Sequence, residues 1–389
     1  MDFSNPNRTT VGAGPITLGR LLATFLKIGS IGFGGGMAII ALMEHEFVRK
    51  RRLISIDEFV HGVGLGQILG PFAVNTSIFL GYRLFGLMGG LLSAVAFLAP
   101  SVTLVIILSH LYFRYHSVPA LQGTVAGLGP IVIALILNAG WSIGRKVPRS
   151  WKGALIAIGA LVAGITQLNT IWVLVVAGVV GFLLNPGFPA SKGPARAEKP
   201  KRGAVSMMIT VALPAAAPLA AIGMTFLKIG LVFFGGGFVL VPVLHDRLVT
   251  QLGWLKPREF IDGLAISNLT PGPIAVLATF AGYHLAGVGG ALVATVALFV
   301  PATVLMLGIS YQYARFREDH RVLRFLSGVN PAVAGLILSA ALLLSRSALM
   351  SWRGYLVCGL SLLLLGRLRW HPAFVLAIGA AAGYFGALP

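Results

Sequence analysis

Two lysines occur inside apolar stretches, at equivalent places in the two halves of the chain. Lys27 and Lys228 each lie about 11 residues into a run long enough to cross a membrane, which places them near mid-depth in lipid. A cation there costs several kcal/mol unless it is paired or solvated. No acidic residue lies close to either lysine in sequence, so the partner we expect is an anion that binds and leaves. The alternative is a lysine whose long side chain reaches back to the membrane surface.

A phenylalanine followed by three glycines occurs shortly after each lysine. These residues are Phe33, Gly34, Gly35 and Gly36 in the first half, and Phe234, Gly235, Gly236 and Gly237 in the second. Consecutive glycines are weak helix formers and leave backbone N–H groups free. Irregular backbone at membrane depth is tolerated where it lines a cavity or is buried in protein. We therefore expect a broken helix whose N–H groups bind substrate, with close helix packing as the alternative.

A proline-glycine turn follows in each half, Gly70-Pro71-Phe72 in the first and Pro271-Gly272-Pro273 in the second. A proline at the start of a helix is favourable, and the N-terminal end of that helix attracts anions. Polar side chains that could donate hydrogen bonds flank both turns: Asn75, Thr76, Asn268 and Thr270. The sequence predicts an anion site at these turns, and the alternative is a structural turn with capping side chains.

One acid and one histidine occupy the same two aligned positions in both halves. They are Glu44-His45 and His245-Asp246, and Glu46 follows in the first half only. Histidine titrates near neutral pH, so these residues could couple transport to protons. An interfacial charged turn is the alternative. Because none of the 11 acids is predicted clearly at mid-depth, the pattern argues against a cation carrier.

Composition identifies the environment of these residues as a lipid bilayer. The chain has 389 residues, of which 57% are hydrophobic and 11% charged, and its mean hydropathy is +0.88. Soluble domains carry about 25% charged residues, so soluble enzymes and nucleic-acid binders are excluded. The net charge of +19 fits basic cytoplasmic loops of a membrane protein. The one cysteine, Cys358, excludes an internal disulfide and a cysteine-based metal cluster.

The chain is a tandem repeat with a period of 201 residues. Thr24-Phe25-Leu26-Lys27-Ile28-Gly29 aligns with Thr225-Phe226-Leu227-Lys228-Ile229-Gly230, and the register holds without a gap through residue 100. We divide the chain into a polar tail (1–15), a first transmembrane repeat (16–185), a basic cytoplasmic linker (186–204) and a second repeat (205–389).

Each repeat contains about five spans and one shorter segment. In the first half the apolar runs cover 17–47, 86–113, 118–143, 152–167 and 169–185. The segments 55–85 and 256–286 are broken near the middle, and each arm of about 15 residues is too short to cross lipid. They predict re-entrant helical hairpins, with two thin spans as the alternative. An odd number of spans and the basic loops together predict that the second repeat is inverted.

Taken together, these motifs resemble the chromate ion transporter family in its fused two-domain form. The match runs through 21–104 and again through 222–305. The resemblance implies an inner-membrane, multi-pass secondary transporter that exports chromate and confers chromate resistance, in exchange or competition with sulfate. It points to Lys27, Phe33 to Gly35, Glu46, Lys228, Phe234 to Gly236 and Pro271-Gly272-Pro273. The first hairpin departs from the family pattern, because it has Gly70-Pro71-Phe72 where Pro-Gly-Pro is usual.

The sequence therefore predicts an all-α polytopic membrane protein of two inverted-topology repeats that bind a tetrahedral dianion where they meet. We expect an oxyanion such as chromate or sulfate and the lipid bilayer as partners, with no nucleic acid, metal, cofactor or enzymatic activity. The sequence leaves a homodimer open. An anion channel, or a transporter of another anion on the same fold, is the alternative.

Overall fold

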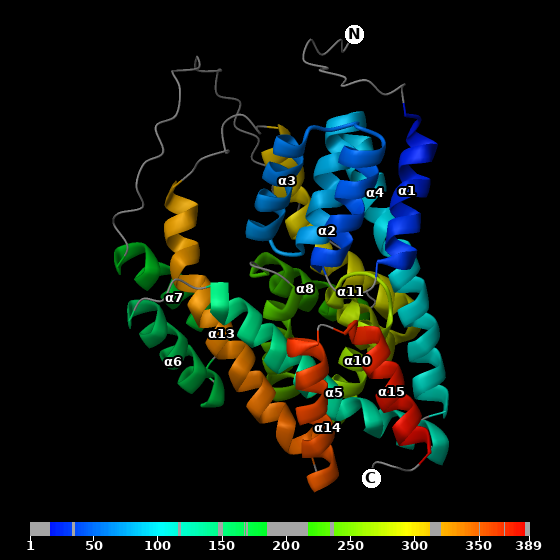
Figure 1. Ribbon diagram of the computed structural model, residues 1–389, viewed down its shortest axis with the longest axis vertical. Helices are drawn as coiled ribbons and strands as arrows, with labels where there is room; N and C mark the ends of the chain where they lie inside the picture. Colours follow the sequence, from blue (N-terminus) through cyan, green and yellow to red (C-terminus); the bar gives the residue numbers. More distant parts are fainter. Residues whose placement is uncertain are drawn as a thin grey trace.

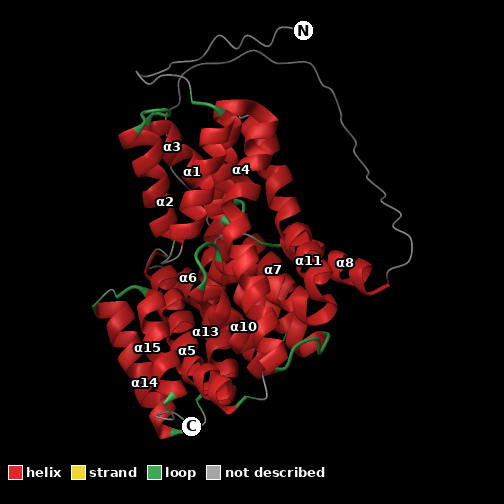
Figure 2. Cartoon of the chain, turned by 90° about the vertical axis from the view of Figure 1, so that its right-hand side faces the viewer, coloured by secondary structure: helices red, strands yellow, loops and turns green. Residues whose placement is uncertain are grey.

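The computed structural model describes residues 16–32, 36–115, 118–146, 151–166, 168, 170–184, 217–233, 237–311, 320–349, 351–368 and 370–385. Within these ranges the chain forms helices and no strands (Figure 2), which confirms the all-α class. The polar tail (1–15), the basic linker (186–204), Phe33 to Gly35 and Phe234 to Gly236 lie outside the described residues.

The helices of the two repeats follow one another in the same order (Figure 1). The first repeat contains α1 (Leu18–Ile31), α2 (Gly36–Glu44), the π-helix η1 (His45–Lys50), α3 (Ile56–Ile68), α4 (Phe72–Tyr115), α5 (Pro119–Lys146), α6 (Trp151–Ile165) and α7 (Thr170–Leu184). The second contains α8 (Ala217–Leu231), η2 (Gly237–Val239), α9 (Leu240–Leu244), η3 (His245–Gln251), α10 (Pro257–Leu269), η4 (Ile274–Val276), α11 (Leu277–Tyr311), α13 (His320–Ala348), α14 (Trp352–Leu362), η5 (Leu363–Arg367) and α15 (Pro372–Tyr384).

The predicted segments of the first repeat agree with these helices. The apolar run over 17–47 is divided, because α1 ends at Ile31 and α2 begins at Gly36, and this is the helix break that the glycine sequence predicted. The reason is the glycine sequence, which offers little helix propensity at the point where the chain breaks. The other apolar runs of the first half coincide with the second part of α4 and with α5, α6 and α7.

The long helices α4 and α11 each fold back on themselves at a glycine. Gly86 has φ 64° within α4, and Gly287 has φ 59° within α11. The side chains of Thr279 and Thr295 are hydrogen-bonded at 2.7 Å although 16 residues separate them. A straight helix would hold them about 24 Å apart, so the two arms of α11 lie side by side.

The segment before each fold-back forms the predicted helical hairpin. In the first repeat α3 packs against the first arm of α4, and in the second α10 packs against α11. Gly62 lies against the ring of Phe79, and the equivalent Gly263 lies against the ring of Phe280. Helices α3 and α10 have 13 residues each. That is about 20 Å of helix, shorter than the hydrocarbon layer of about 30 Å, as a re-entrant hairpin requires.

The later helices of each repeat pack against helices of the other repeat, and we call them the exchanged helices. Helix α5 of the first repeat packs against α14 and α15 of the second, and the equivalent α13 packs against α6 and α7 of the first. Glycines allow these close contacts, because Gly127 lies against the carbonyl of Gly379, and Gly328 against that of Ala177. Since α4 also packs on α11 and α5 on α13, the two repeats form one interlocked body.

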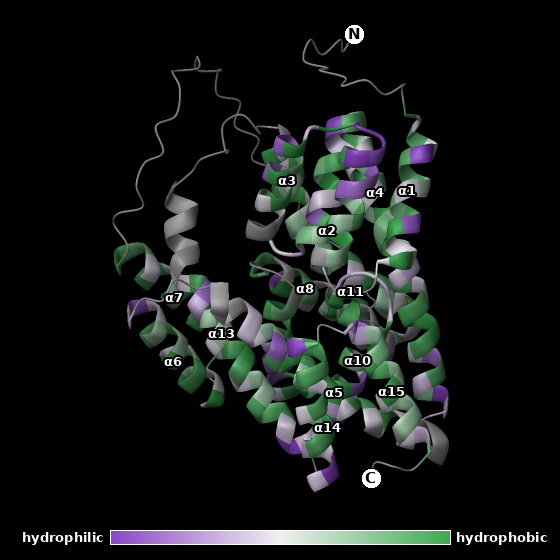
Figure 3. Ribbon diagram, viewed as in Figure 1, coloured by the Kyte–Doolittle hydropathy of each residue, from purple (hydrophilic) through white to green (hydrophobic). Residues whose placement is uncertain are grey.

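The outer surface is apolar, as a lipid-embedded protein requires. Among the described residues, four helical segments contain a stretch long and apolar enough to cross a membrane: Phe72–Tyr115, Gly123–Ser142, Ile274–Tyr311 and Gly328–Ala348. Hydrophobic residues dominate the outer helices in Figure 3. Large side chains such as Trp151 and Trp172 are exposed there. In water such a surface would drive aggregation, and in a bilayer it faces acyl chains.

Candidate functional site

The tip of each hairpin turns at a glycine with positive φ. Gly70 has φ 113° and Gly272 has φ 110°, a region that residues with a side chain rarely adopt. These glycines are 202 residues apart, whereas the fold-back glycines Gly86 and Gly287 are 201 apart. The glycine therefore comes one residue later in the second tip, although the two hairpins have the same length, and the short 3₁₀ helix η4 precedes α11 there.

Each tip lies against the end of the other repeat's first helix. The N–H of Gly272 donates a hydrogen bond to the carbonyl of Gly32, at 3.0 Å. Reciprocally, a side-chain carbon at Gly70 would collide with the carbonyl oxygen of Phe233. Gly32 and Phe233 are equivalent positions, 201 residues apart. In Figures 1 and 2 α3 lies in the upper part of the molecule and α10 in the lower part, so the hairpins approach from opposite ends.

The second tip has an additional contact with the first repeat. The hydroxyl of Ser101, fully buried on the second arm of α4, donates a hydrogen bond to the carbonyl of Pro271. The equivalent residue in the second repeat is Ala302, which has no hydroxyl. The two tips are thus held differently, and the sequence motifs gave no indication of Ser101.

The glycine-rich segments adjoin these tips. Gly32 and Phe233 immediately precede the segments that begin at Phe33 and Phe234. Gly36, the first residue of α2, faces the ring of Phe72 just after the first tip. The helix break after α1 therefore lies beside both hairpin tips, which brings together motifs that are far apart in sequence.

The two lysines lie one turn before these breaks, and both are exposed on the protein surface. Among the described residues, neither lysine has a carboxylate within ion-pairing distance. Glu46 nevertheless lies within electrostatic range of Lys27, although the sequence separation suggested no acidic neighbour. Partial burial raises the pKa of Glu46, but the hydrogen bond from Lys50 and the charges of Lys50, Arg51 and Lys27 outweigh it and lower that pKa.

The polar side chains near the two tips differ in their hydrogen bonding. Asn75 donates to the carbonyl of Gly66 at 3.3 Å, but its Oδ1 and the hydroxyl of Thr76 are buried without a protein partner. In the second hairpin Asn268 and Thr270 bond to carbonyls of their own helix at 2.8 and 3.0 Å. Among these four residues, therefore, the unsatisfied polar atoms are both in the first hairpin. Buried polar groups normally have hydrogen-bond partners, so these two atoms are available to a ligand or water.

The acid–histidine pairs lie where the π-helical turns begin, with Glu44 at the end of α2, His45 in η1, and His245 and Asp246 in η3. Glu44 pairs with Arg49 at 2.8 Å, and Glu46 pairs with Lys50 at 2.9 Å. His45 is exposed in the same turn. These ion pairs form a charged turn, and the proton-coupling role of these residues stays a prediction.

The second turn is more buried. The ring of His245 packs edge-on against Phe260. Asp246 accepts hydrogen bonds from the N–H of Thr170 at 3.3 Å and from Gln251 at 3.0 Å. Because Thr170 begins α7, Asp246 links the second repeat to the first.

Sequence reasoning missed a buried acid. Asp262 on α10 is 4% exposed and accepts a hydrogen bond from the hydroxyl of Tyr112 at 2.7 Å. It stands between Ile261 and Gly263 within the hairpin arm, and that apolar setting was the available signal. Its partner is 150 positions away in the chain, so only the folded structure reveals the pair.

The comparisons with known proteins agree with this architecture. The family model for chromate transporters matches residues 19–182 and 220–384, one match in each repeat. The chain is 31% identical over 357 residues to the chromate transport protein of Cupriavidus metallidurans, covering 89% of this chain and 88% of the relative. It is 34% identical over 338 residues to the chromate transport protein of Pseudomonas aeruginosa, covering 83% and 80%.

The chain is also 30% identical over 380 residues to the probable chromate transport protein of Synechococcus elongatus, covering 94% of this chain and 95% of the relative. No solved structure matches the fold. The family model matches once in each repeat, and the relatives align over most of the length of the chain. Both findings assign the chain to the same family. The chain belongs to the chromate transporter family, whose members are membrane transporters and not enzymes.

Proposed function

We propose that this protein is a secondary transporter that exports chromate across the inner membrane, in competition or exchange with sulfate. The observation that carries the proposal is the hydrogen bond from Gly272 to Gly32, together with the reciprocal contact of Gly70 with Phe233. These contacts support a single region, formed by both repeats, where two hairpin tips and two glycine-rich breaks meet. Transporters of inverted repeats bind substrate in such a region.

The chemistry of this region suits a tetrahedral dianion. Chromate carries only hydrogen-bond acceptors, so its site needs donors and positive charge. The N-terminal end of the helix after each tip supplies free N–H groups and a partial positive charge. The hydroxyl of Thr76 lacks a protein partner and can donate to an oxyanion. Lys27 and Lys228 supply charge at the approaches to the site, one in each repeat.

Transport would follow from a change in the packing of the repeats. The interlocking of α5 with α14 and α15, and of α13 with α6 and α7, supports movement of helix groups that include both repeats. A rocking motion about the tip contacts would expose the site to each side in turn. Chromate and sulfate share charge and shape, so electrostatics alone would not separate them, and size and hydrogen-bond strength would decide selectivity.

Uptake into liposomes tests this function. The purified protein is reconstituted, and the initial rate of radiolabelled chromate uptake is measured with and without excess sulfate, against protein-free liposomes. We expect saturable uptake that sulfate inhibits. Monodisperse, folded protein that moves neither anion would refute the proposed substrate. Conductance in a planar bilayer without saturation or exchange would favour an anion channel.

A further inference from the structure

Asp262 is a buried carboxylate whose role the anion site does not explain. It is 4% exposed, and it lies in a helix arm where Ile261, Gly263 and Leu264 are also buried. Its hydrogen-bond partner is the hydroxyl of Tyr112, at 2.7 Å, from the second arm of α4. Because α10 belongs to the second repeat and α4 to the first, this bond spans the interface between the repeats.

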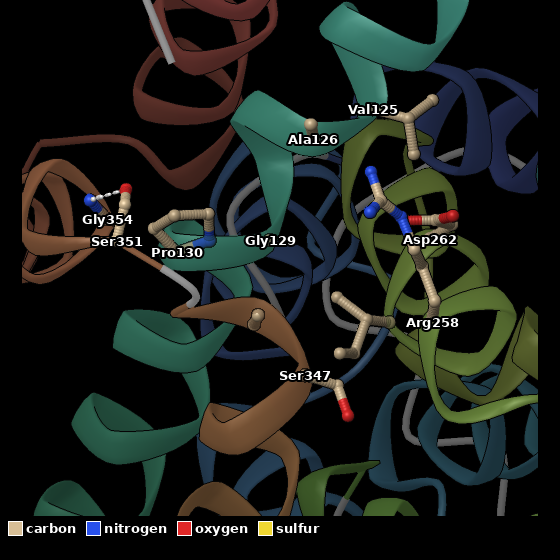
Figure 4. A pocket seen from close by; sticks show the side chains of 11 residues that line it. Val125, Ala126, Gly129, Pro130, Arg258, Asp262, Ser347, Ser351 and Gly354 are labelled. Atoms are coloured by element: carbon tan, nitrogen blue, oxygen red, sulfur yellow. Dashed lines mark hydrogen bonds between the residues drawn. The ribbon is translucent and has the colours of Figure 1, made fainter. Parts of the chain in front are cut away.

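A small cavity lies beside Asp262. The cavity measures about 40 Å³. A water molecule needs roughly 10–15 Å³, so the cavity has room for water. Figure 4 shows Asp262 and Arg258 together on one wall, with Pro130 and Ser347 on the others. The exposed Arg258, one helical turn before Asp262, attracts it electrostatically without an ion pair.

Few charged or titratable groups surround Asp262. Its own helix contributes Arg258 and Glu259, and α4 contributes Tyr112. The described cavity wall from α5, α13 and α14 contains no titratable side chain, and consists of Val125, Ala126, Gly129, Pro130, Ser347, Ala348, Ser351 and Gly354. From η3, His245 contacts Phe260, which lies on α10 with Asp262. From α11, Tyr283 and His284 lie against Phe113, the neighbour of Tyr112.

This environment makes the charge of Asp262 sensitive to its access to water. A buried carboxylate is tolerated when it is hydrogen-bonded and reaches water, and it takes up a proton when both are lost. An ionised carboxylate also holds a phenol more strongly than a protonated one, because charge-assisted hydrogen bonds are about twice as strong as neutral ones. The proton on Asp262 and the contact between α10 and α4 are therefore linked.

We propose that Asp262 is the proton-binding site of the transport cycle. When it is ionised, its hydrogen bond to Tyr112 fastens α10 to α4. When it takes a proton from the cavity, that bond weakens and the repeats are free to move. The inference rests on the proposed transport function, and it assigns the driving ion to a residue outside the anion site.

Two assays on the full-length protein in liposomes separate coupling from substrate transport. The first measures exchange of external labelled chromate for internal unlabelled chromate, which needs no net proton movement. The second measures net uptake driven by a pH gradient, with the membrane potential held at zero by potassium and valinomycin. The variant is Asp262→Asn. The matched control is Glu259→Gln on the same helix, which removes a carboxylate but keeps an oxygen that can accept the hydrogen bond from the N–H of Lys256.

For Asp262→Asn we expect exchange within about twofold of wild type, and a fall of about tenfold or more in pH-driven uptake. Glu259→Gln should retain both activities. Wild-type exchange without any effect of the pH gradient would overturn the inference and leave the transport function standing. Equal pH-driven uptake by Asp262→Asn and wild type would overturn it as well. Absence of wild-type exchange would instead count against the transport function.

If Asp262→Asn also loses exchange, Tyr112→Phe tests whether Asp262 binds the coupling proton. This variant removes only the hydroxyl that stabilises the ionised carboxylate. The midpoint of the pH profile of net uptake should then move upward by about one pH unit. A profile with an unchanged midpoint would overturn the inference.

Discussion

The backbone N–H of Gly272 donates a 3.0 Å hydrogen bond to the carbonyl of Gly32. Gly32 follows the last turn of α1 in the first repeat, whereas Gly272 is the hairpin tip of the second. The bond therefore connects the point where one repeat's helix breaks to the point where the other repeat's hairpin turns. A movement of one repeat against the other that opens this region has to shift this bond.

Substitution of a tip glycine should lower both stability and transport. An alanine at Gly272 would adopt φ near 110° and collide with the hydroxyl of Ser101. Such strain costs about 1–3 kcal/mol. We expect a lower melting temperature of the purified protein and slower chromate uptake for Gly272→Ala and for Gly70→Ala.

The matched control for this prediction is Gly64→Ala on α3. No atom lies within 4 Å of the position that its new methyl group would occupy. Alanine also favours a helix more than glycine does, so this variant should be as stable as wild type or more so. Equal melting temperatures for Gly64→Ala and Gly272→Ala would refute the role of the tip.

Loss of the Ser101 hydroxyl should weaken the contact between the second hairpin tip and α4. Ser101→Ala removes the hydrogen bond to the Pro271 carbonyl, which is worth about 1 kcal/mol. It also makes room at Gly272, so the effects of Ser101→Ala and Gly272→Ala should not add. A double-mutant cycle on melting temperature measures this coupling. Ser30→Ala, whose hydroxyl bonds only to its own helix at Leu26, is the control, and strict additivity would contradict the contact.

The glycines between exchanged helices should tolerate no large side chain. Gly127 on α5 and Gly328 on α13 face backbone carbonyls of the opposite repeat. A leucine at either position has to separate the helices, and overpacking of this kind costs about 1–3 kcal/mol. We expect lower melting temperatures and less monodisperse protein in size-exclusion chromatography. Gly159→Leu on α6, which has open space around it, should behave as wild type.

Because α5 and α13 pack against helices of the opposite repeat, the halves should be stable only together. A chain cut within the linker at 186–204 and co-expressed as two fragments should copurify and transport chromate. Either fragment alone should aggregate, since its exchanged helices leave apolar surface uncovered. A single half that is monodisperse and melts as sharply as the full chain would show that the exchange is dispensable.

The sequence predicted the elements of this fold well, because their boundaries depend on local chemistry. The glycines and prolines at Gly70 and Pro71 mark the first hairpin tip, and the period of 201 residues carries each helix into the second repeat. The one-residue difference that brings Gly272 into the place of Gly70 was not predicted, because the glycine and proline there are reversed in order.

Relationships between distant segments could not be predicted. The exchange of α14 and α15 onto α5 depends on tertiary packing that one sequence does not encode locally. The burial of Asp262 was not predicted, since its partner Tyr112 is remote in sequence. Lys27 and Lys228 are both exposed on the protein surface, and their predicted part in binding the substrate stays a prediction.

Equilibrium binding of labelled chromate to the purified protein tests the central claim most directly. Wild type should bind chromate saturably, with displacement by sulfate. Lys27→Ala and Lys228→Ala should each weaken binding by about tenfold or more, because each removes a cation from the approach to the site. Arg20→Ala, an exposed cation two turns earlier on α1, should bind as wild type does. Unchanged chromate affinity in both lysine variants, with full folding, would contradict the account.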